Sequence, residues 1–426
     1  MTQRPAVLVT DGEDRAALAV VRSLGRAGYR LHVAARSRRS IAGASRHVST
    51  RDVVADPLQS PSRFVDDVVA VVHRRGIAVV IPITDAALLA LTADRSRLGD
   101  VLLPWPSAER VRRVADKALV TDAARELGIA VPAQRLVSTA DEAIAAAKQL
   151  RCPLVIKPSR SVREQGSGRA VKLVVAHAAD ASALRSRLAE LEPAAYPFLL
   201  QERIVGAGIG VSVLIRDGRL LAHFSHRRLR ERPPSGGVSV YAESIAPDDA
   251  LVQQSAALLQ RLDWHGVAMI EYKVDATSGV PHLMEINGRF WGSLQLAIDA
   301  GVDFPALLLD AERGVPPRPA TYRAGVRFRW WWGDVDHLLV RLARTPVGLS
   351  LPVGAPSRVQ VIRQFLAAGW PHRDSDVFRA DDVRPFVVET VDWARTRVAA
   401  AIGAARRART RPTRAERMSS AAASPV

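Results

Sequence analysis

The decapeptide "HLMEINGRFW", residues 282–291, alternates polar or charged side chains with apolar ones. Glu285, Asn287 and Arg289 occupy every second position, and in a strand residues i and i+2 point to the same face. The apolar residues between them are typical of a strand with one side in a core. A charge among apolar neighbours must be neutralised. The identity of the group that faces these polar side chains is therefore the first question that the sequence raises.

A second strand-like segment, "GVAMIEYKVD" (266–275), is joined to this stretch by the turn-rich loop "ATSGV". Two such segments with a short loop between them predict a β-hairpin. If Asp275 faces Pro281, the same register places Glu271 directly opposite Glu285. Opposed Cβ atoms lie only ~5 Å apart, where like charges are unfavourable unless a positive group lies between them.

Two interpretations of this acid pair remain open. Glu271, Glu285 and Asn287 offer two carboxylates and an amide oxygen, and hard cations such as Mg²⁺ or Mn²⁺ prefer oxygen ligands. Alternatively, one glutamate is protonated, or Arg289 or Lys273 pairs with it. A register slip of one residue would also remove the opposition.

Composition limits the class of protein. The chain has 426 residues, of which 48% are hydrophobic, and this is typical of a globular protein with two or three domains. Its single cysteine, Cys152, excludes a disulfide framework and a thiolate metal site. The net charge of +17 comes from 55 arginines, since the chain has only five lysines. No basic stretch is interleaved with stacking aromatics, so no nucleic-acid partner is expected.

Neither a membrane nor a secretory route is expected. No apolar run approaches the ~20 residues of a spanning helix, and no secretory segment follows Met1. The expected location is cytoplasmic. The sequence does not fix the oligomeric state, for which a homodimer is one hypothesis.

The first 105 residues predict a small α/β domain. The pattern indicates a buried parallel strand that ends in a turn (6–12), an amphipathic helix (15–27) and a second strand (30–35). A further strand and helix follow near residue 80. The domain lacks a G-x-G-x-x-G fingerprint, which argues against an NAD-dependent oxidoreductase. Two prolines and a helix N-cap at Ser107 mark the expected boundary.

The central segment carries lysine and glycine positions that suit an anion. "CPLVIKPSR" predicts a short strand that delivers Lys157 into a crevice. Gly166 and Gly168 then flank Ser167 between two strand-like runs, and glycine-rich backbone can turn N–H groups toward an anion. A mobile surface turn is the alternative for these three residues.

The next strand is expected to end at Gln201 and Glu202, followed by a glycine-rich link and a hairpin that turns at Asp217-Gly218. By themselves, polar residues at a strand end are usually solvated. Further on, His226 and Arg228 could present positive charge to an anionic substrate, or could belong to a solvated sheet edge.

Five elements in order resemble the ATP-grasp superfamily, in the branch that includes carbamoyl-phosphate synthase and amino acid ligases. They are Lys117, "VIKP" with Lys157, the glycine loop at 166–168, "QERIVG" at 201–206, and Glu271 with "MEINGRFWGS" at 284–293. The resemblance covers about residues 110–305, and the first domain resembles the pre-ATP-grasp domain of those enzymes.

The resemblance implies a fold of class α/β and α+β, with a Rossmann-like pre-ATP-grasp domain, a two-subdomain ATP-grasp fold and a C-terminal extension. The implied segments are the pre-ATP-grasp domain at 1–105, the ATP-grasp domain at 106–312, an extension at 313–408 and a disordered basic tail at 409–426. The three tryptophans at 330–332 are interpreted as a docking face for the extension, or as a cover over the substrate pocket.

The resemblance also implies a role for each residue of the motifs. ATP phosphates would meet Lys117, Lys157 and the closing loop of Gly166, Ser167 and Gly168. Adenine would meet Gln201, Glu202 and the backbone near Ile204. One or two Mg²⁺ (or Mn²⁺) ions would bind to Glu271, Glu285 and Asn287. The phosphoryl group or acyl intermediate would meet Arg289 as the catalytic residue.

By the same resemblance, the chain is expected to be an ATP- and Mg²⁺-dependent ligase for small molecules. A carboxylate would attack the γ-phosphorus of ATP to give an acyl phosphate, and an amine or similar nucleophile would displace phosphate. The alternative is an ATP-binding regulatory protein without catalysis, because no motif identifies the substrate.

Overall fold

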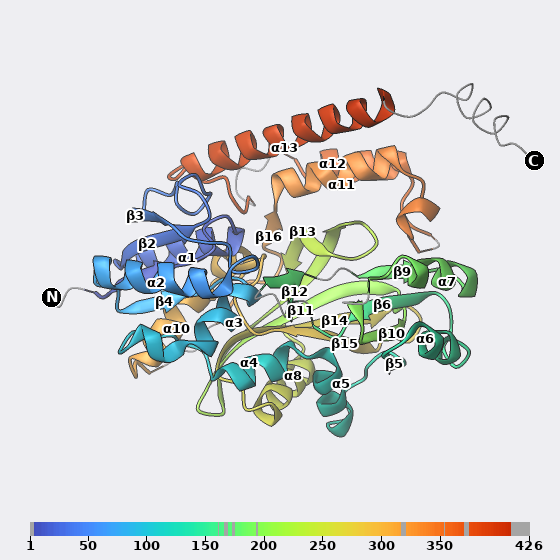
Figure 1. The fold of residues 1–426 in the computed structure, drawn as a ribbon, viewed down its shortest axis with the longest axis horizontal. Coiled ribbons are helices and arrows are strands. Elements are labelled where there is room, and N and C mark those ends of the chain that lie inside the picture. The colour runs from blue at the N-terminus through green and yellow to red at the C-terminus, as the bar shows by residue number, and fades with distance from the viewer. Residues whose placement is uncertain are drawn as a thin grey trace, which may run out of the picture.

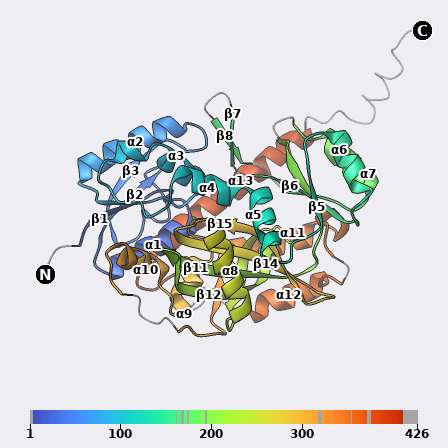
Figure 2. The same cartoon turned by 90° about the horizontal axis from the view of Figure 1, so that it is seen from below.

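The computed structural model describes residues 4–409 apart from 161, 166–168, 173–174, 193–194, 317–320, 353 and 370–374. At 162–165, 169–172 and 403–409 it describes the backbone but not the side chains. Within these ranges the chain forms two four-stranded sheets, one six-stranded sheet and a separate two-stranded hairpin. The two four-stranded sheets lie toward opposite ends of the molecule, with the six-stranded sheet between them (Figures 1 and 2).

The N-terminal sheet is parallel, with strand order β3-β2-β1-β4. Its strands are β1 (Ala6–Val9), β2 (Arg30–Ala35), β3 (Val48–Val53) and β4 (Val79–Ile81). Its helices are α1 (Arg15–Arg26), α2 (Pro61–Arg75) and α3 (Asp85–Ala93). All four residues of β1 are buried, which is typical of a parallel strand covered on both faces. These elements confirm the strand–helix–strand prediction.

A pair of helices then leads to the smaller antiparallel sheet. The helices are α4 (Ala108–Ala115) and α5 (Lys117–Glu126), and α5 is followed by Gly128, whose φ of +69° suits a helix end. The sheet has the order β5-β10-β6-β9 and contains β5 (Gln134–Val137), β6 (Leu154–Pro158), β9 (Ala176–Ala178) and β10 (Phe198–Glu202). The remaining elements here are α6 (Ala140–Ala147), α7 (Ala181–Ala189) and the separate hairpin of β7 (Val162–Gln165) and β8 (Arg169–Lys172).

The six-stranded sheet has the order β15-β14-β11-β12-β13-β16. Its strands are β11 (Gly206–Arg216), β12 (Arg219–Arg232), β13 (Val238–Ser244), β14 (Gly266–Asp275), β15 (Pro281–Asn287) and β16 (Arg327–Arg329). The helices around it are α8 (Asp249–Arg261), α9 (Leu294–Ala300) and α10 (Phe304–Glu312). One hydrophobic core joins this sheet to the N-terminal sheet, whereas the β5–β10 sheet has a smaller core of its own.

Three local predictions in this region need correction. The glycine-rich link lies inside β11, where Gly210 passes so close to His226 that a Cβ would lie 2.2 Å from the ring Cε1. The strand-like stretch 282–291 forms a strand only as far as Asn287. The solvated-edge interpretation of His226 and Arg228 is wrong, because β12 pairs with β11 and β13 on its two sides. The turn at Asp217-Gly218 is confirmed, with both residues at positive φ.

The C-terminal helices lie over one side of the molecule (Figure 1). They are α11 (Trp331–Ala343), α12 (Arg358–Ala367) and α13 (Arg384–Arg409). Buried ion pairs tie this region to α1, namely Arg15–Asp376 and Arg22–Asp382. Among the described helices, none has both the length and the apolar character that crossing a membrane requires. Residues 410–426, most of the predicted basic tail, lie outside the described residues.

Candidate active site

The hairpin of β14 and β15 places Glu271 opposite Glu285, as the sequence predicts. The register near the turn differs from the prediction, because Val274 and not Asp275 faces Pro281. A β-bulge next to Glu271 adds one residue to β15 and restores the predicted register at the acid pair. The two one-residue shifts therefore cancel where the acids lie.

The bulge also creates an acceptor for a lysine from another sheet. Met284 is the extra residue of β15, and its carbonyl oxygen accepts a 2.7 Å hydrogen bond from Nζ of Lys157. Lys157 lies in β6 and is 8% exposed. A bulge leaves a residue outside the strand ladder, so its polar backbone groups are free for other partners. The bulge thus joins the smaller sheet to the acidic hairpin.

Glu285 lies between two lysines. Its Oε2 is 3.5 Å from Nζ of Lys117, at the start of α5, and 3.7 Å from Nζ of Lys157. Burial by itself would raise the pKa of Glu285, but the two ammonium groups outweigh it and lower this pKa to about 2. Burial conversely lowers the pKa of Lys157 despite the neighbouring carboxylate. Glu285 is therefore fully ionised at neutral pH.

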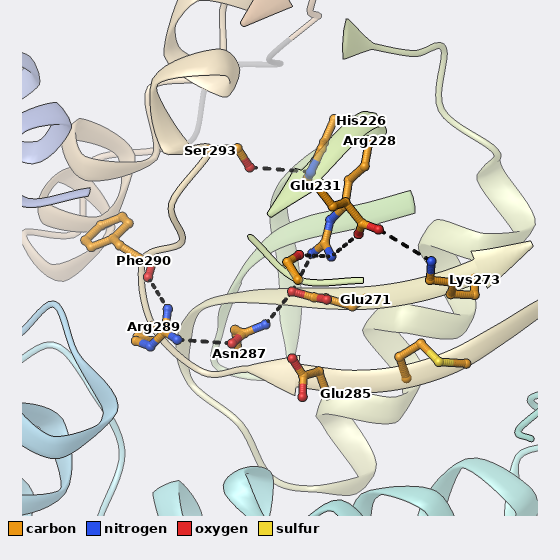
Figure 3. A network of polar contacts seen from close by, with 12 residues as sticks. His226, Arg228, Glu231, Glu271, Lys273, Glu285, Asn287, Arg289, Phe290 and Ser293 are labelled. Carbon is orange, nitrogen blue, oxygen red and sulfur yellow. Dashed lines mark hydrogen bonds and ion pairs between the residues drawn. The ribbon is translucent and has the colours of Figure 1, made fainter. Parts of the chain in front are cut away.

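Glu271 has a different cationic partner, Arg228 of β12. The Arg228 guanidinium contacts Glu271 and also lies 3.2 Å from Glu231, which is 3.6 Å from Lys273. Burial lowers the pKa of Arg228, but the two carboxylates more than reverse this and raise it. Figure 3 shows Arg228 directed at Glu271 from β12, which is separated from β14 by β11 in the sheet.

Asn287 connects the acid pair to the predicted catalytic arginine (Figure 3). Its Nδ2 donates a 3.0 Å hydrogen bond to Glu271, and its Oδ1 accepts one of 3.2 Å from Arg289. Arg289 also forms a 2.9 Å ion pair with Asp85, at the start of α3. Burial lowers the pKa of Arg289, but Asp85 and its other acidic neighbours raise it above its ordinary value.

The prediction that cationic side chains pair with the two glutamates is correct, but the cationic partners that it named are wrong. It named Arg289 and Lys273, but these pair with Asp85 and Glu231 respectively. Sequence reasoning did not assign Asp85 to the site, although Asp85 is the last residue of the loop "PITD" (82–85) at the carboxyl end of a predicted strand. Ligand-binding residues of parallel sheets often lie at that end. Glu231 had no comparable local signal.

His226 lies behind this cluster and is fully buried. Its Nε2 is 3.4 Å from Ser293 Oγ, while its Nδ1 has no hydrogen-bond partner among the described residues. Burial lowers the pKa of His226 to about 3, with a further contribution from Arg228, so the ring is neutral at pH 7. Direct contact between His226 and a substrate remains a prediction.

The predicted adenine residues lie at the end of β10. Gln201 is buried and donates a 2.7 Å hydrogen bond to Gln134. Glu202 forms a 3.1 Å ion pair with Arg151, and Ile204 is half-buried in the following loop. Their contact with adenine stays a prediction. Gly166, Ser167 and Gly168 lie outside the described residues.

The site offers an oxygen-only donor set for a metal. No group of three or more His, Cys, Asp and Glu side chains suited to a metal occurs in the described part of the chain. Instead, two carboxylates and the Asn287 amide oxygen lie together on the hairpin. Hard divalent cations favour such oxygens, with phosphate oxygens and waters completing the shell. The donor set fits Mg²⁺, although Arg228, Lys117 and Lys157 contact the carboxylates in this structure.

The sequence of the chain is similar to a known family and to known proteins. A family described as "ATP-grasp in the biosynthetic pathway with Ter operon" matches residues 194–332. The carbamoyl phosphate synthase large chain of Clostridium acetobutylicum is 25% identical over 250 residues, which cover 57% of this chain and 22% of that protein. The Xylella fastidiosa large chain is 26% identical over 194 residues, or 43% and 17%. The chain thus spans about a fifth of the length of the curated relatives it matches.

Solved structures resemble more of the chain. The L-amino acid ligase from Bacillus licheniformis has a TM-score of 0.58 at 16% identity and covers 75% of this chain and 78% of its own. The ADP complex of N5-carboxyaminoimidazole ribonucleotide synthetase has 0.59 at 16%, covering 80% and 87%. A biotin carboxylase domain from Hydrogenobacter thermophilus, in complex with MgADP, has 0.60 at 15%, covering 77% and 74%. At this identity the likeness shows a shared fold.

Proposed function

The chain is an ATP-grasp protein by fold, and from this premise we propose that it is an ATP- and Mg²⁺-dependent ligase. It would activate a small-molecule carboxylate as an acyl phosphate and join it to an amine or similar nucleophile. The observation that carries this proposal is the convergence of Lys117 and Lys157, from separate elements, on the ionised Glu285. Two structural neighbours, named as a ligase and a synthetase, support the reaction class.

The charges around the acid pair suit a phosphate chain. Lys117 and Lys157 share the single carboxylate of Glu285, so one anionic side chain lies between these two cations. Incoming phosphate oxygens would give both lysines a second anionic partner. Phosphoryl transfer depends mainly on alignment and on stabilisation of charge, which fixed buried cations provide without reorganisation.

The reaction requires two bond exchanges. In the first, a carboxylate oxygen bonds to the γ-phosphorus of ATP, and the bond to the bridging oxygen breaks to release ADP. In the second, the nitrogen of a neutral amine bonds to the acyl carbon, phosphate leaves with the C–O electron pair, and the nitrogen loses a proton. Both steps build negative charge on oxygen, and Arg289 is suited to stabilise that charge because its guanidinium is ionised and held by Asp85.

Mg²⁺ would be held by Glu271, Glu285 and Asn287, and when bound it neutralises charge on the phosphate oxygens. Adenine would lie against Gln201, Glu202 and the backbone near Ile204. The glycine loop at 166–168 would close over the phosphates and exclude water from the acyl phosphate. Both lysines and Arg289 lie at the acidic hairpin, and this favours catalysis over the alternative of a regulator without catalysis.

The proposal extends to partners and location. The substrates are small molecules, and the use of ATP as a substrate supports a cytoplasmic location. For the homodimer hypothesis, light scattering of the purified chain gives the mass in solution. A mass near the monomer value of 46.1 kDa would contradict it.

The direct test traps the acyl phosphate with hydroxylamine, so that the natural amine need not be known. The chain is incubated with ATP, Mg²⁺, hydroxylamine and a panel of carboxylates, and hydroxamate and ADP are measured. We expect both products in equal amounts with at least one carboxylate, and neither product without Mg²⁺. ATP binding with no ADP from any carboxylate would support the regulator instead.

A matched pair of lysine variants locates the activity. Lys157→Met removes the buried ammonium group, whereas Lys148→Met removes an exposed one at the end of α6. We expect the first to lower ADP release by about a hundredfold or more, which corresponds to about 2.7 kcal/mol of transition-state stabilisation. The second should leave the rate unchanged. Equal rates in both variants would exclude Lys157 from the reaction.

A further inference from the structure

A cavity of about 1030 Å³ lies beside the candidate active site. Four parts of the chain line it: the loops at the carboxyl ends of β1, β2, β3 and β4, the turn between β12 and β13, the segment that contains Arg289 and Gly292, and the C-terminal helices α11 and α13. The volume suits a small organic molecule. Arg289 lines the cavity and also donates to Asn287, so a bound molecule would lie next to a residue of the candidate active site.

The lining is acidic in a basic protein. Eight acidic residues and six arginines line the cavity, and no lysine or histidine does so, although the whole chain has a net charge of +17. Each of the six arginines has an acidic partner, for example Arg36 with Asp56, and Arg232 with Asp336. The arginines therefore already have anionic partners, and a cationic ligand would stabilise the ionised form of a lining carboxylate that lacks a cationic partner.

One carboxylate of the lining lacks a complete set of partners. Glu389 of α13 accepts a 2.7 Å hydrogen bond at Oε1 from Nε1 of Trp330. Its Oε2 is buried, and among the described residues it has no hydrogen-bond partner. An unpaired buried carboxylate oxygen is costly, so a donor supplied by a ligand would stabilise it. Burial accordingly raises the pKa of Glu389 to about 7.

Tryptophan rings form the apolar part of the lining. Trp330, Trp332 and Trp393 all contribute, and each indole N–H already donates, to Glu389, Thr390 and Asp336 respectively. What these side chains still offer a ligand is therefore ring surface. Such surface suits an apolar or aromatic body and also attracts cations.

We propose that this cavity binds an organic amine with an apolar or aromatic body, whose protonated nitrogen donates to Oε2 of Glu389 and whose body lies against Trp330 and Trp332. The inference deepens the proposed function and rests on it, because the cavity adjoins Arg289 and the bound amine would be a substrate of the ligase. It also assigns a role to the C-terminal extension, whose helices α11 and α13 form one wall of the substrate cavity.

The test compares probes of matched shape and different charge. Tryptamine, its acidic counterpart indole-3-propionate and neutral indole-3-ethanol are titrated into the full chain by calorimetry. We expect tryptamine to bind at least about tenfold more tightly than either of the others, which corresponds to about 1.4 kcal/mol. Equal or tighter binding of the acid would overturn the proposal, as would no binding of tryptamine.

A conservative variant identifies the carboxylate. Glu389→Gln removes the charge but keeps an oxygen that can accept from Trp330, while Glu126→Gln removes an exposed acid on α5. We expect only Glu389→Gln to weaken tryptamine binding, by about tenfold or more. Unchanged binding in this variant would overturn the assignment. If Glu389→Gln does not fold, the comparison of the three probes in the unaltered chain still decides the proposal.

MgATP binding in the same samples separates this inference from the proposed function. If MgATP binds and tryptamine does not, the cavity assignment fails while the ligase proposal stands. If tryptamine binds with the expected charge preference and MgATP does not bind, the ligase proposal fails while the amine site stands. Glu389→Gln should leave MgATP affinity unchanged, because the predicted nucleotide contacts lie on the hairpin and the smaller sheet.

Discussion

Replacing Glu285 by glutamine removes the charge that two buried lysines share. The carboxylate oxygen lies 3.5 Å from Lys117 and 3.7 Å from Lys157. Burial would raise the pKa of Glu285 from its ordinary 4.5, but the lysines lower it to about 2. At about 1.36 kcal/mol per pKa unit, this difference stabilises the folded protein by about 3 kcal/mol at neutral pH.

The sign of the pH dependence follows from the direction of this shift. The pKa of Glu285 is lower in the folded than in the unfolded state, so the stabilisation is complete well above pH 4.5 and is lost as the pH falls toward about 2. We expect Glu285→Gln to lower the free energy of unfolding by about 3 kcal/mol at pH 7. Near pH 3 the loss should be about half as large.

Urea unfolding followed by tryptophan fluorescence measures both values. Glu126→Gln is the control, because Glu126 forms a 2.8 Å ion pair with Arg261 in which both side chains are more than half exposed. Exposed pairs of this kind contribute at most about 1 kcal/mol. A loss in Glu285→Gln no larger than in the control at pH 7, or one that does not shrink at pH 3, would refute the electrostatic account of the site.

Three further predictions concern other parts of the structure. Arg228→Met removes the cation that contacts Glu271, so Mg²⁺ without ATP should raise the melting temperature of this variant more than that of the unaltered chain; an equal rise would contradict the metal assignment. Gly210→Ala places a Cβ 2.2 Å from the His226 ring and should lower the free energy of unfolding, measured by urea unfolding, by about 2 kcal/mol. An unchanged free energy of unfolding would mean that the ring can move aside. Asp382→Ala leaves the buried Arg22, which is 1% exposed, without its carboxylate partner, and should lower the free energy of unfolding by about 3–5 kcal/mol in the same assay. A loss below about 1 kcal/mol would show that this buried pair does not hold the C-terminal region to α1.

The sequence by itself predicts the elements whose signals are local. The parallel strand β1 follows from its apolar run, and the turn at Asp217-Gly218 follows from two residues that tolerate positive φ. The acid pair also follows from period-two alternation and a short loop. Its register is nevertheless reached through a bulge at Met284, which no sequence pattern indicated.

The smaller sheet shows how local signals and motif order combine. The strand that carries Lys157 and the strand that ends at Glu202 were predicted from apolar runs, and the structure confirms both. The order of the five motifs along the chain indicated the ATP-grasp fold, because each motif is a short sequence pattern that can be recognised by itself. The individual roles of Lys117, Gln201 and Ile204 toward ATP stay predictions.

Only the tertiary structure decided which charges meet. Arg228 reaches Glu271 from a strand 43 positions away in the chain, and Arg289 meets Asp85 from the N-terminal sheet. In a chain with 55 arginines, composition offers many cationic partners for each acid, so packing selects the pair. Glu389 lies in the lining of the cavity beside Arg289 because of the way in which α13 packs against the rest of the fold. Contacts between distant segments are determined by the packing of the whole core, so no local sequence pattern predicts them.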